Sequence, residues 1–357
     1  MVFFEKAEEY YMAREILDKR KANYRQLNIE LLRIFSMLMV LVIHYNVGTN
    51  GQTTHEMVVT EPIKAIGIAS LKSLSFICVN CFIIISGYFG IKWKCKGFCN
   101  YLFQISFWGG MIHVIAVVLN CSDFSILHML GNMFMFLING NWFFVAYLGL
   151  YMFAPILNAY IEKVDTRHLG RMVLVFYLFQ TVFGWIFKTC VEFTQGLTFV
   201  SFFGLYLLGA YLRKSSMKCF LFPAKVDMMM YLGVGVICVI GSMLTNYIGI
   251  QKDVYSYISP LQIIQTIYLF LFFKKIHVSE RYHKLVLFFS SSAFSALLMH
   301  SWDGVRLYGN GLRWIDDSLP VPFCFTVIYI VLFFCTACCL DKIRIFAWNH
   351  SLAKVFK

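Results

Sequence analysis

The sequence predicts an all-α protein, a polytopic transmembrane helical bundle of about ten spans. Of its 357 residues, 59% are hydrophobic and only 14% are charged, whereas a soluble domain carries about 25% charged residues. The mean hydropathy is +0.68. One span needs roughly 20 apolar residues, so ten spans use about 200 residues and leave enough for loops and ends. This composition excludes a soluble enzyme, a nucleic-acid-binding protein and a disordered chain.

Ten apolar runs, separated by charges and loop residues, are the candidate spans. They lie at about 28–46, 70–90, 100–119, 141–158, 172–188, 198–212, 229–248, 259–273, 285–300 and 321–340. The runs 198–212 and 259–273 are the weakest because they are short. A further apolar stretch, 124–139, is too short to span and is predicted to be re-entrant or interfacial. We expect one transmembrane domain, 28–340, between an N-terminal segment, 1–27, and a tail, 341–357.

The distribution of basic residues predicts the topology. The net charge is +12, from 31 Lys and Arg against 19 Asp and Glu. Placing the N-terminus inside puts 24 basic residues in cytoplasmic segments and five outside, the bias that orients membrane proteins. We therefore expect an even number of spans with both ends in the cytoplasm. Segment 1–27 mixes acidic and basic residues without a long apolar core, which favours a cytoplasmic amphipathic helix over a signal peptide.

The first span carries three ionisable residues, Glu30, Arg33 and His44. At about 100° per residue, Arg33 and His44 are three turns and roughly 20° apart, and Glu30 lies on the same stripe. Arg33 and His44 are separated by roughly 16 Å along the helix axis. One interpretation is a helix-start ion pair and an interfacial histidine. The other is a chemical site, in which arginine holds a phosphate or carbonyl and histidine takes a proton.

Several strings of the sequence resemble the acyltransferase-3 family of integral-membrane acyltransferases. The spacing of Glu30, Arg33 and His44 is similar to the family signature, although the family often has Asp at the first position. Later strings match in order along nearly the whole chain: VNCFIIISGYF (79–89), NWFFVAYLGLYMFAPILN (141–158), FFGLYLLGAYLR (202–213) and SAFSALLMH (292–300). The resemblance implies transfer of an acyl group, usually acetyl, from cytoplasmic acetyl-CoA to a hydroxyl of a polysaccharide or envelope glycan outside a bacterial plasma membrane.

In this interpretation His44 is the catalytic base or a transient acyl carrier, since an alcohol that attacks a thioester must lose a proton. Arg33 orients the donor or neutralises developing charge, and Glu30 fixes the arginine side chain. The partners implied are an acyl-CoA donor, a carbohydrate acceptor and the lipid bilayer, with no nucleic acid; the oligomeric state is left open.

Four further residues are candidates for substrate binding. Lys72 is either a ligand for a coenzyme A phosphate or a snorkelling lysine. Ser86 either permits close helix packing or acts chemically. Trp142 either shapes the acceptor path or belongs to an interfacial aromatic belt. His300, at the outer end of the ninth predicted span, is a candidate for substrate contact.

No metal site is predicted. The twelve cysteines form no disulfide framework, and their CxxC pairs have no matching second pair. His113 is interpreted as a core histidine, and His128 as a loop residue. Residues 301–320 are expected to form the longest outer loop, where Trp302, Arg313 and Trp314 either bind sugar or anchor at the interface.

A transporter or flippase for a lipid-linked glycan is the alternative function. Arg33 and His44 would then form a proton relay. Against it, the sequence shows no repeated half and no paired Gly- or Pro-broken helices.

Overall fold

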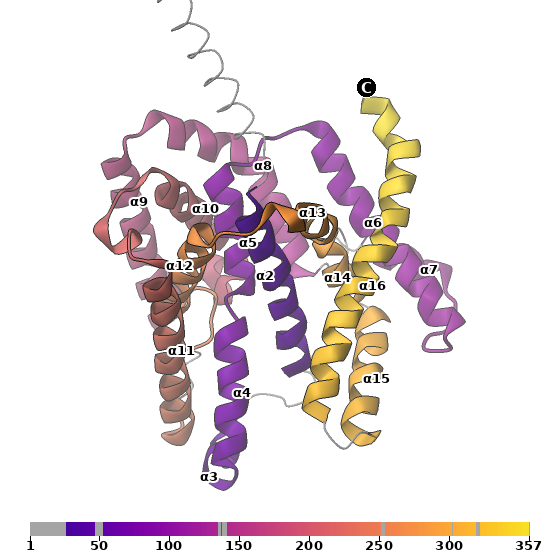
Figure 1. Ribbon diagram of the computed structural model, residues 1–357, viewed down its shortest axis with the longest axis horizontal. Coiled ribbons are helices and arrows are strands. Elements are labelled where there is room, and N and C mark those ends of the chain that lie inside the picture. The colour runs from indigo at the N-terminus through magenta and orange to yellow at the C-terminus, as the bar shows by residue number, and fades with distance from the viewer. Residues whose placement is uncertain are drawn as a thin grey trace, which may run out of the picture.

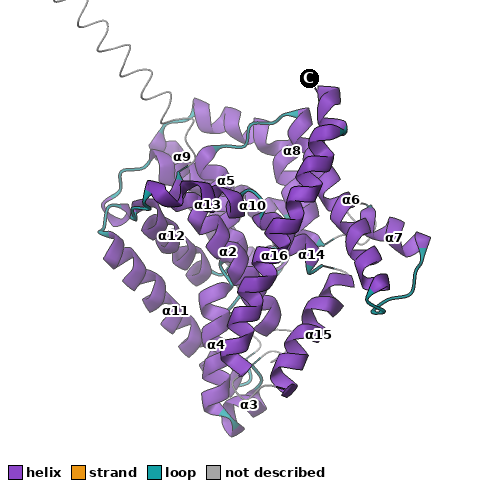
Figure 2. Ribbon diagram, turned by 45° about the vertical axis from the view of Figure 1, so that its right-hand side comes forward, coloured by secondary structure: helices purple, strands orange, loops and turns teal. Residues whose placement is uncertain are grey.

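The computed structural model describes residues 26–46, 53–134, 137, 141–250, 254–301, 303–318 and 322–356. In this part of the chain every regular element is helical (Figure 2), which confirms the predicted fold class. Of the predicted N-terminal segment 1–27, residues 1–25 lie outside the described residues. The longer helices are α2 (Leu27–Tyr45), α4 (Pro62–Ser75), α5 (Cys78–Phe89), α6 (Cys95–Val118), α8 (Trp142–Lys163), α9 (Thr166–Phe179), α10 (Phe199–Lys214), α11 (Ala224–Tyr247), α12 (Pro260–Lys275), α15 (Asp303–Ser318) and α16 (Pro322–His350).

Short helical elements connect the longer ones. They are α3 (His55–Thr60), α7 (Ile126–Met133), the π-helical η2 (Gln180–Ile186), η3 (Val191–Gly196), η4 (Lys218–Phe220), η5 (Glu280–Tyr282), α13 (His283–Ser290), α14 (Ala293–Met299) and η6 (Leu352–Phe356).

Eight helical segments of the described chain are long and apolar enough to cross a membrane, which confirms a polytopic bundle. They are Leu27–Tyr45, Pro62–Phe89, Cys95–Val118, Trp142–Lys163, Thr166–Ile186, Ala224–Tyr247, Glu280–Met299 and Cys324–His350. The two weakest predicted spans are the 16-residue helices α10 and α12. Each is about 24 Å long, shorter than a hydrocarbon core of roughly 30 Å. Most of α10 is nevertheless buried, so it is a central element of the bundle.

The centre of the bundle is built from α2, α5 and α10. Figure 1 shows α2 beside α4 and α5, with α11 and α12 on one flank and α14–α16 on the other. Helices α5 and α10 cross closely because Gly87 and Gly209 meet the opposing backbones. A Cβ on Gly87 would lie 2.1 Å from the Tyr206 carbonyl oxygen, and one on Gly209 would lie 2.3 Å from that of Ile84. Small residues at such crossings are the usual means by which membrane helices approach.

Some predicted boundaries differ from the structure. The predicted span 70–90 is the second half of Pro62–Phe89, which contains α4 and α5 and a short break at Phe76–Ile77. The predicted tail 341–357 begins inside α16, where Arg344 Nη2 pairs with Asp341 Oδ2 at 2.7 Å. Trp108 Nε1 also donates to Asp341 Oδ1 at 3.0 Å. These buried charges are paired, so the helix continues past the apolar run without exposing them to lipid.

The prediction of a loop at 301–320 was wrong, because residues 303–318 form α15. Its buried residues Gly304, Tyr308, Leu312 and Ile315 recur every three or four positions, the pattern of an amphipathic helix. Arg313 and Trp314 are on its exposed face, and Trp302 lies outside the described residues.

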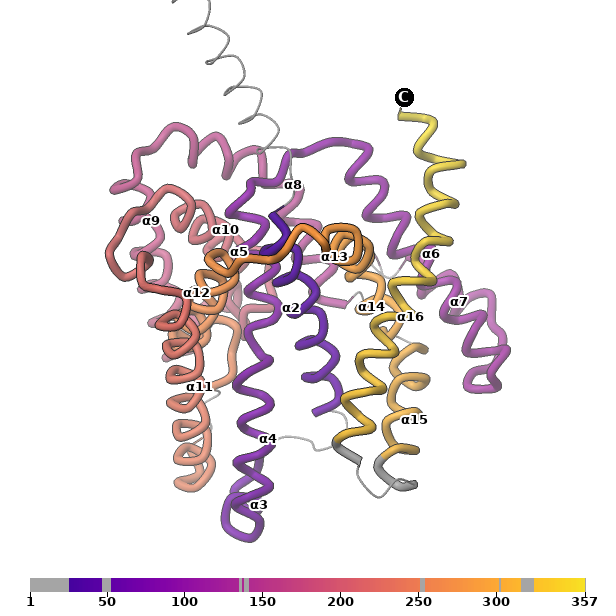
Figure 3. The backbone as a smooth tube through the Cα atoms, in the orientation of Figure 1, coloured from indigo at the N-terminus to yellow at the C-terminus, as the bar shows by residue number. Residues whose placement is uncertain are grey.

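The stretch 124–139 contains α7, an eight-residue helix that is too short to cross a membrane. It lies against α6 (Figure 3), where a Cβ on Gly109 would be 2.3 Å from the Asn132 carbonyl oxygen. Ile126, Leu127 and Leu130 remain exposed, as expected of a helix at a lipid interface.

Candidate functional site

A cavity of about 270 Å³ lies along α2 and is lined by Arg33 and His44 of the predicted polar stripe. On α2 its wall is formed by residues spaced three or four apart, which share one helix face: Arg33, Met37, Val40, Ile43 and His44. The structure therefore places the arginine and the histidine in one cavity. Since they are roughly 16 Å apart along the axis, the cavity is elongated.

Helix α5 forms a second wall, which includes Ser86. The two helices run antiparallel (Figure 1), so Ser86 is toward the Arg33 end and Cys78 toward the His44 end. The Ser86 hydroxyl donates to the carbonyl of Phe82, one turn earlier, at 2.9 Å. This bond satisfies the hydroxyl proton within the helix and favours the packing interpretation of Ser86 over a chemical one.

An aromatic wall completes the cavity. Trp142 is the first residue of α8, whose N-cap Asn141 accepts a hydrogen bond from Phe143 N at 3.1 Å. The Trp142 ring is 5.4 Å from that of Tyr257, and both line the cavity together with Tyr101. Sequence reasoning missed Tyr101 and Tyr257, because they come from separate segments and share no helical period with the polar stripe.

Glu30 and Arg33 lie one turn apart at the start of α2. Arg33 Nε is 3.7 Å from Glu30 Oε1, so the two form an ion pair in which the Glu30 side chain is buried and the Arg33 side chain is 37% exposed. Within the described structure Arg33 Nε makes no hydrogen bond. The guanidinium is thus held beside Glu30, on a side chain that lines the cavity.

His44 and His300 form a hydrogen-bonded pair, Nδ1 of the first to Nε2 of the second. Their proton positions follow from a third group. His300 Nδ1 is 2.5 Å from the carbonyl oxygen of Ala296, which can only accept, so Nδ1 carries a hydrogen and neutral His300 has its lone pair on Nε2. That lone pair accepts from His44 Nδ1–H. The lone pair on His44 Nε2 is then the one that neither histidine uses for a hydrogen bond within the pair. The His44 side chain lines the cavity.

His300 is therefore a neighbour of His44 rather than part of the cavity wall. It is 3% exposed and packs against the rings of Tyr308 and Phe333, at 5.5 and 6.3 Å between centroids. Sequence reasoning singled out this residue but not its pairing with His44, because α14 and α2 are far apart in the chain.

Lys72 is not brought to the cavity. Its ammonium group lies over the rings of Tyr255 and Phe76, at 5.0 and 5.6 Å from their centroids. It is one turn from Ile68, whose carbonyl accepts from Asn46 just past the His44 end of α2. Lys72 is thus at the end of α2 opposite to the guanidinium, and a role with a donor phosphate there stays untested.

Two residues within the family-like strings have structural roles. Tyr206 O–H donates to Asn158 Oδ1 at 2.7 Å and accepts from Ile91 N at 2.7 Å, while Asn158 Nδ2 donates to the Ile91 carbonyl at 2.8 Å. This ring of hydrogen bonds joins α8 and α10 to the connection between α5 and α6, where Gly90 has φ +78°.

Comparison with known proteins assigns the family. The acyltransferase-3 profile, described as an acyltransferase domain, matches residues 26–342. No curated protein and no solved structure matches the chain. The matched range contains every residue of the cavity and both histidines. The chain belongs to the acyltransferase-3 family of membrane acyltransferases.

Proposed function

We propose that this membrane acyltransferase moves an acetyl group from cytoplasmic acetyl-CoA to a hydroxyl of an extracytoplasmic polysaccharide or envelope glycan, in a bacterial plasma membrane. The observation that carries the proposal is the elongated cavity, with a guanidinium at one end and an imidazole with a free lone pair at the other. An elongated cavity suits the extended arm that carries the thioester of coenzyme A.

The Arg33 end of the cavity suits the donor. It is at the start of α2, which the distribution of basic residues assigns to the cytoplasmic side. A guanidinium held by Glu30 binds a phosphate or the thioester carbonyl through charge-assisted hydrogen bonds. The acceptor would then approach from the His44 end, against the rings of Trp142 and Tyr257. Aromatic faces of this kind pack against sugar rings.

The transfer step balances with His44 as the base. The acceptor oxygen bonds to the thioester carbon while its proton moves to His44 Nε2. The C–S bond then breaks, and the leaving sulfur takes that proton. His300 Nε2 accepts from His44 Nδ1–H throughout, so it holds the ring orientation and stabilises the transient imidazolium. In the carrier variant, Nε2 attacks the thioester carbon and the C–S bond breaks with release of coenzyme A thiolate. The acceptor hydroxyl then takes the acetyl group from Nε2, and its proton passes to the thiolate or to solvent.

The test uses purified protein and acetyl-CoA labelled in the acetyl group. We expect label to move to an added glycan, or to water in its absence, with release of coenzyme A thiol. A glycan flippase would do neither. Rapid denaturation at neutral pH during turnover distinguishes the two roles of His44, since label on the protein that is lost in His44→Gln supports the carrier. Inside-out vesicles test the direction: transfer to a glycan in the lumen from acetyl-CoA outside supports it.

A further inference from the structure

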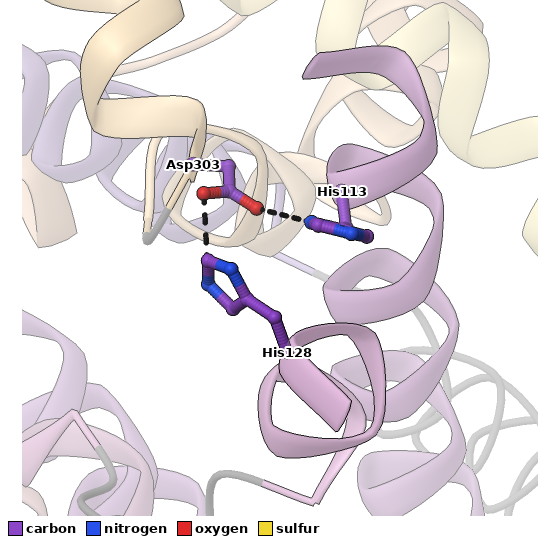
Figure 4. Close-up of side chains that lie close together, drawn as sticks. All are labelled: His113, His128 and Asp303. Atoms are coloured by element: carbon purple, nitrogen blue, oxygen red, sulfur yellow. Dashed lines mark hydrogen bonds and ion pairs between the residues drawn. The ribbon is translucent and has the colours of Figure 1, made fainter. Parts of the chain in front are cut away.

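Three metal-ligating side chains meet at a second place in the molecule, away from the cavity. They are His113 from α6, His128 from α7 and Asp303 at the start of α15, and Figure 4 shows both imidazoles converging on the carboxylate. Their ligand atoms all lie within 4.8 Å of one another. We propose that His113, His128 and Asp303 bind a divalent transition metal ion of the zinc class, at the outer rim of the bundle.

The distances fit such an ion. His113 Nδ1 is 2.8 Å from Asp303 Oδ2, and His128 Nε2 is 3.7 Å from Asp303 Oδ1. Bonds of about 2.0–2.2 Å to a tetrahedral zinc ion place neighbouring ligand atoms roughly 3.3–3.5 Å apart. One observed distance is shorter than this value and the other is longer, and they end on different oxygens of the carboxylate. A movement of the half-exposed His128 side chain would bring both imidazoles to one ion.

The charge of Asp303 also favours a bound cation. Its side chain is 6% exposed, and in the described part of the chain no Lys or Arg pairs with it. Its close partners are His113 Nδ1 and Asn132 Nδ2, the latter at 3.1 Å. A buried carboxylate that no Lys or Arg compensates costs free energy. A bound cation supplies that charge, and Asn132 then orients the ligating carboxylate.

Binding changes the protonation of His113. Without an ion, Nδ1–H donates to Asp303 and Nε2 accepts a long hydrogen bond from Ser125 N at 3.4 Å. With an ion on Nδ1, the proton moves to Nε2, which can then no longer accept from Ser125 N. Two imidazoles and one carboxylate leave a position for water, a donor set typical of zinc.

The site would join three helices close to the proposed base. Asp303 follows His300 by three residues, and Gly304 packs against the backbone of Met299, since a Cβ there would lie 1.9 Å from its carbonyl oxygen. A metal ion that links α6, α7 and the start of α15 would therefore hold the segment that carries His300. The proposal does not depend on the reaction that His300 assists.

The test is zinc binding by the full-length protein, purified in detergent after treatment with a chelator. We expect one Zn²⁺ per chain by equilibrium dialysis, and a Tm that rises with Zn²⁺ concentration because the ion binds only the folded state. His128→Ala should lower zinc affinity more than about 100-fold, beyond the usual loss for an outer-shell partner. Because this side chain is half exposed, its removal should leave the fold intact, and Tm without metal checks this.

The matched control is His168→Ala. His168 pairs with Asp165 at 2.9 Å on the surface but belongs to no group of three ligands in the described residues, so its loss should leave zinc affinity unchanged. Co²⁺ provides a second readout: tetrahedral visible bands without a thiolate charge-transfer band support the assigned ligands. Absence of stoichiometric binding, equal affinity in His128→Ala, or a thiolate band would overturn the proposal.

Discussion

His300 offers a sharp test of the proposed chemistry, because it lies behind the base and does not line the cavity. His300→Leu removes the acceptor for His44 Nδ1–H and keeps an apolar side chain of similar size between Tyr308 and Phe333. The imidazole of His44 then loses its fixed tautomer and the partner of its charged form.

The magnitude follows from that one hydrogen bond. A bond to a charged group contributes about 1.5–3 kcal/mol, and each 1.36 kcal/mol is tenfold in rate. We therefore expect His300→Leu to lower kcat by roughly 10–150-fold while KM for acetyl-CoA stays within about twofold, since the residue does not touch the donor. The assay is the initial rate of labelled acetyl transfer, with Tm as the measure of folding.

His300→Gln is the matched variant, because its amide oxygen can take the place of Nε2 as acceptor. The kcat of His300→Gln should be at least tenfold higher than that of His300→Leu, provided that the two variants have comparable Tm. Wild-type kcat in His300→Leu would refute the reasoning, and so would equal losses in the two variants.

Three further predictions concern other parts of the cavity and its helices. Arg33→Ala should raise KM for acetyl-CoA about 10–100-fold by removing charge-assisted bonds, with the exposed Arg313→Ala as control; an unchanged KM argues against a donor site at this end. Ser86→Ala should keep activity within about threefold, because the hydroxyl donates a hydrogen bond within its own helix. A hundredfold loss of activity would instead indicate a catalytic role for the serine. Gly87→Ala should lower Tm, because overpacking typically costs about 1–3 kcal/mol and the new methyl would meet the backbone of α10. The control is Gly67→Ala, where a Cβ meets nothing within 4 Å, and an equal Tm in both variants contradicts the close crossing.

Much of the fold could be predicted from local pattern. All ten apolar runs coincide with helices, since apolar composition and length decide whether a segment spans. Their ends could not be predicted as well. The continuation of α16 depends on the buried pair of Asp341 and Arg344 with Trp108, and tertiary partners of this kind leave no local signal. The helix at 303–318 was missed because charged residues and glycines interrupt its apolar positions, although its amphipathic period was present in the sequence.

Part of the candidate site could likewise be predicted from local spacing, and part could not. Helical spacing placed Glu30, Arg33 and His44 on one stripe of a single helix, and the structure finds the latter two in one cavity. The pairing of His44 with His300 joins elements that are far apart in the chain, so no spacing rule could reveal it. The cluster of His113, His128 and Asp303 was missed for the same reason.

The central claim is that His44 Nε2 performs the proton or acyl transfer, and the most direct measurement compares wild type with His44→Gln at saturating labelled acetyl-CoA. Both proteins should be folded, as judged by Tm and by their amount in the membrane. Loss of general base catalysis predicts a fall in acetyl transfer of about 10²–10⁴-fold, while the exposed His55→Ala stays at the wild-type rate. A rate for His44→Gln within about threefold of wild type would contradict the account.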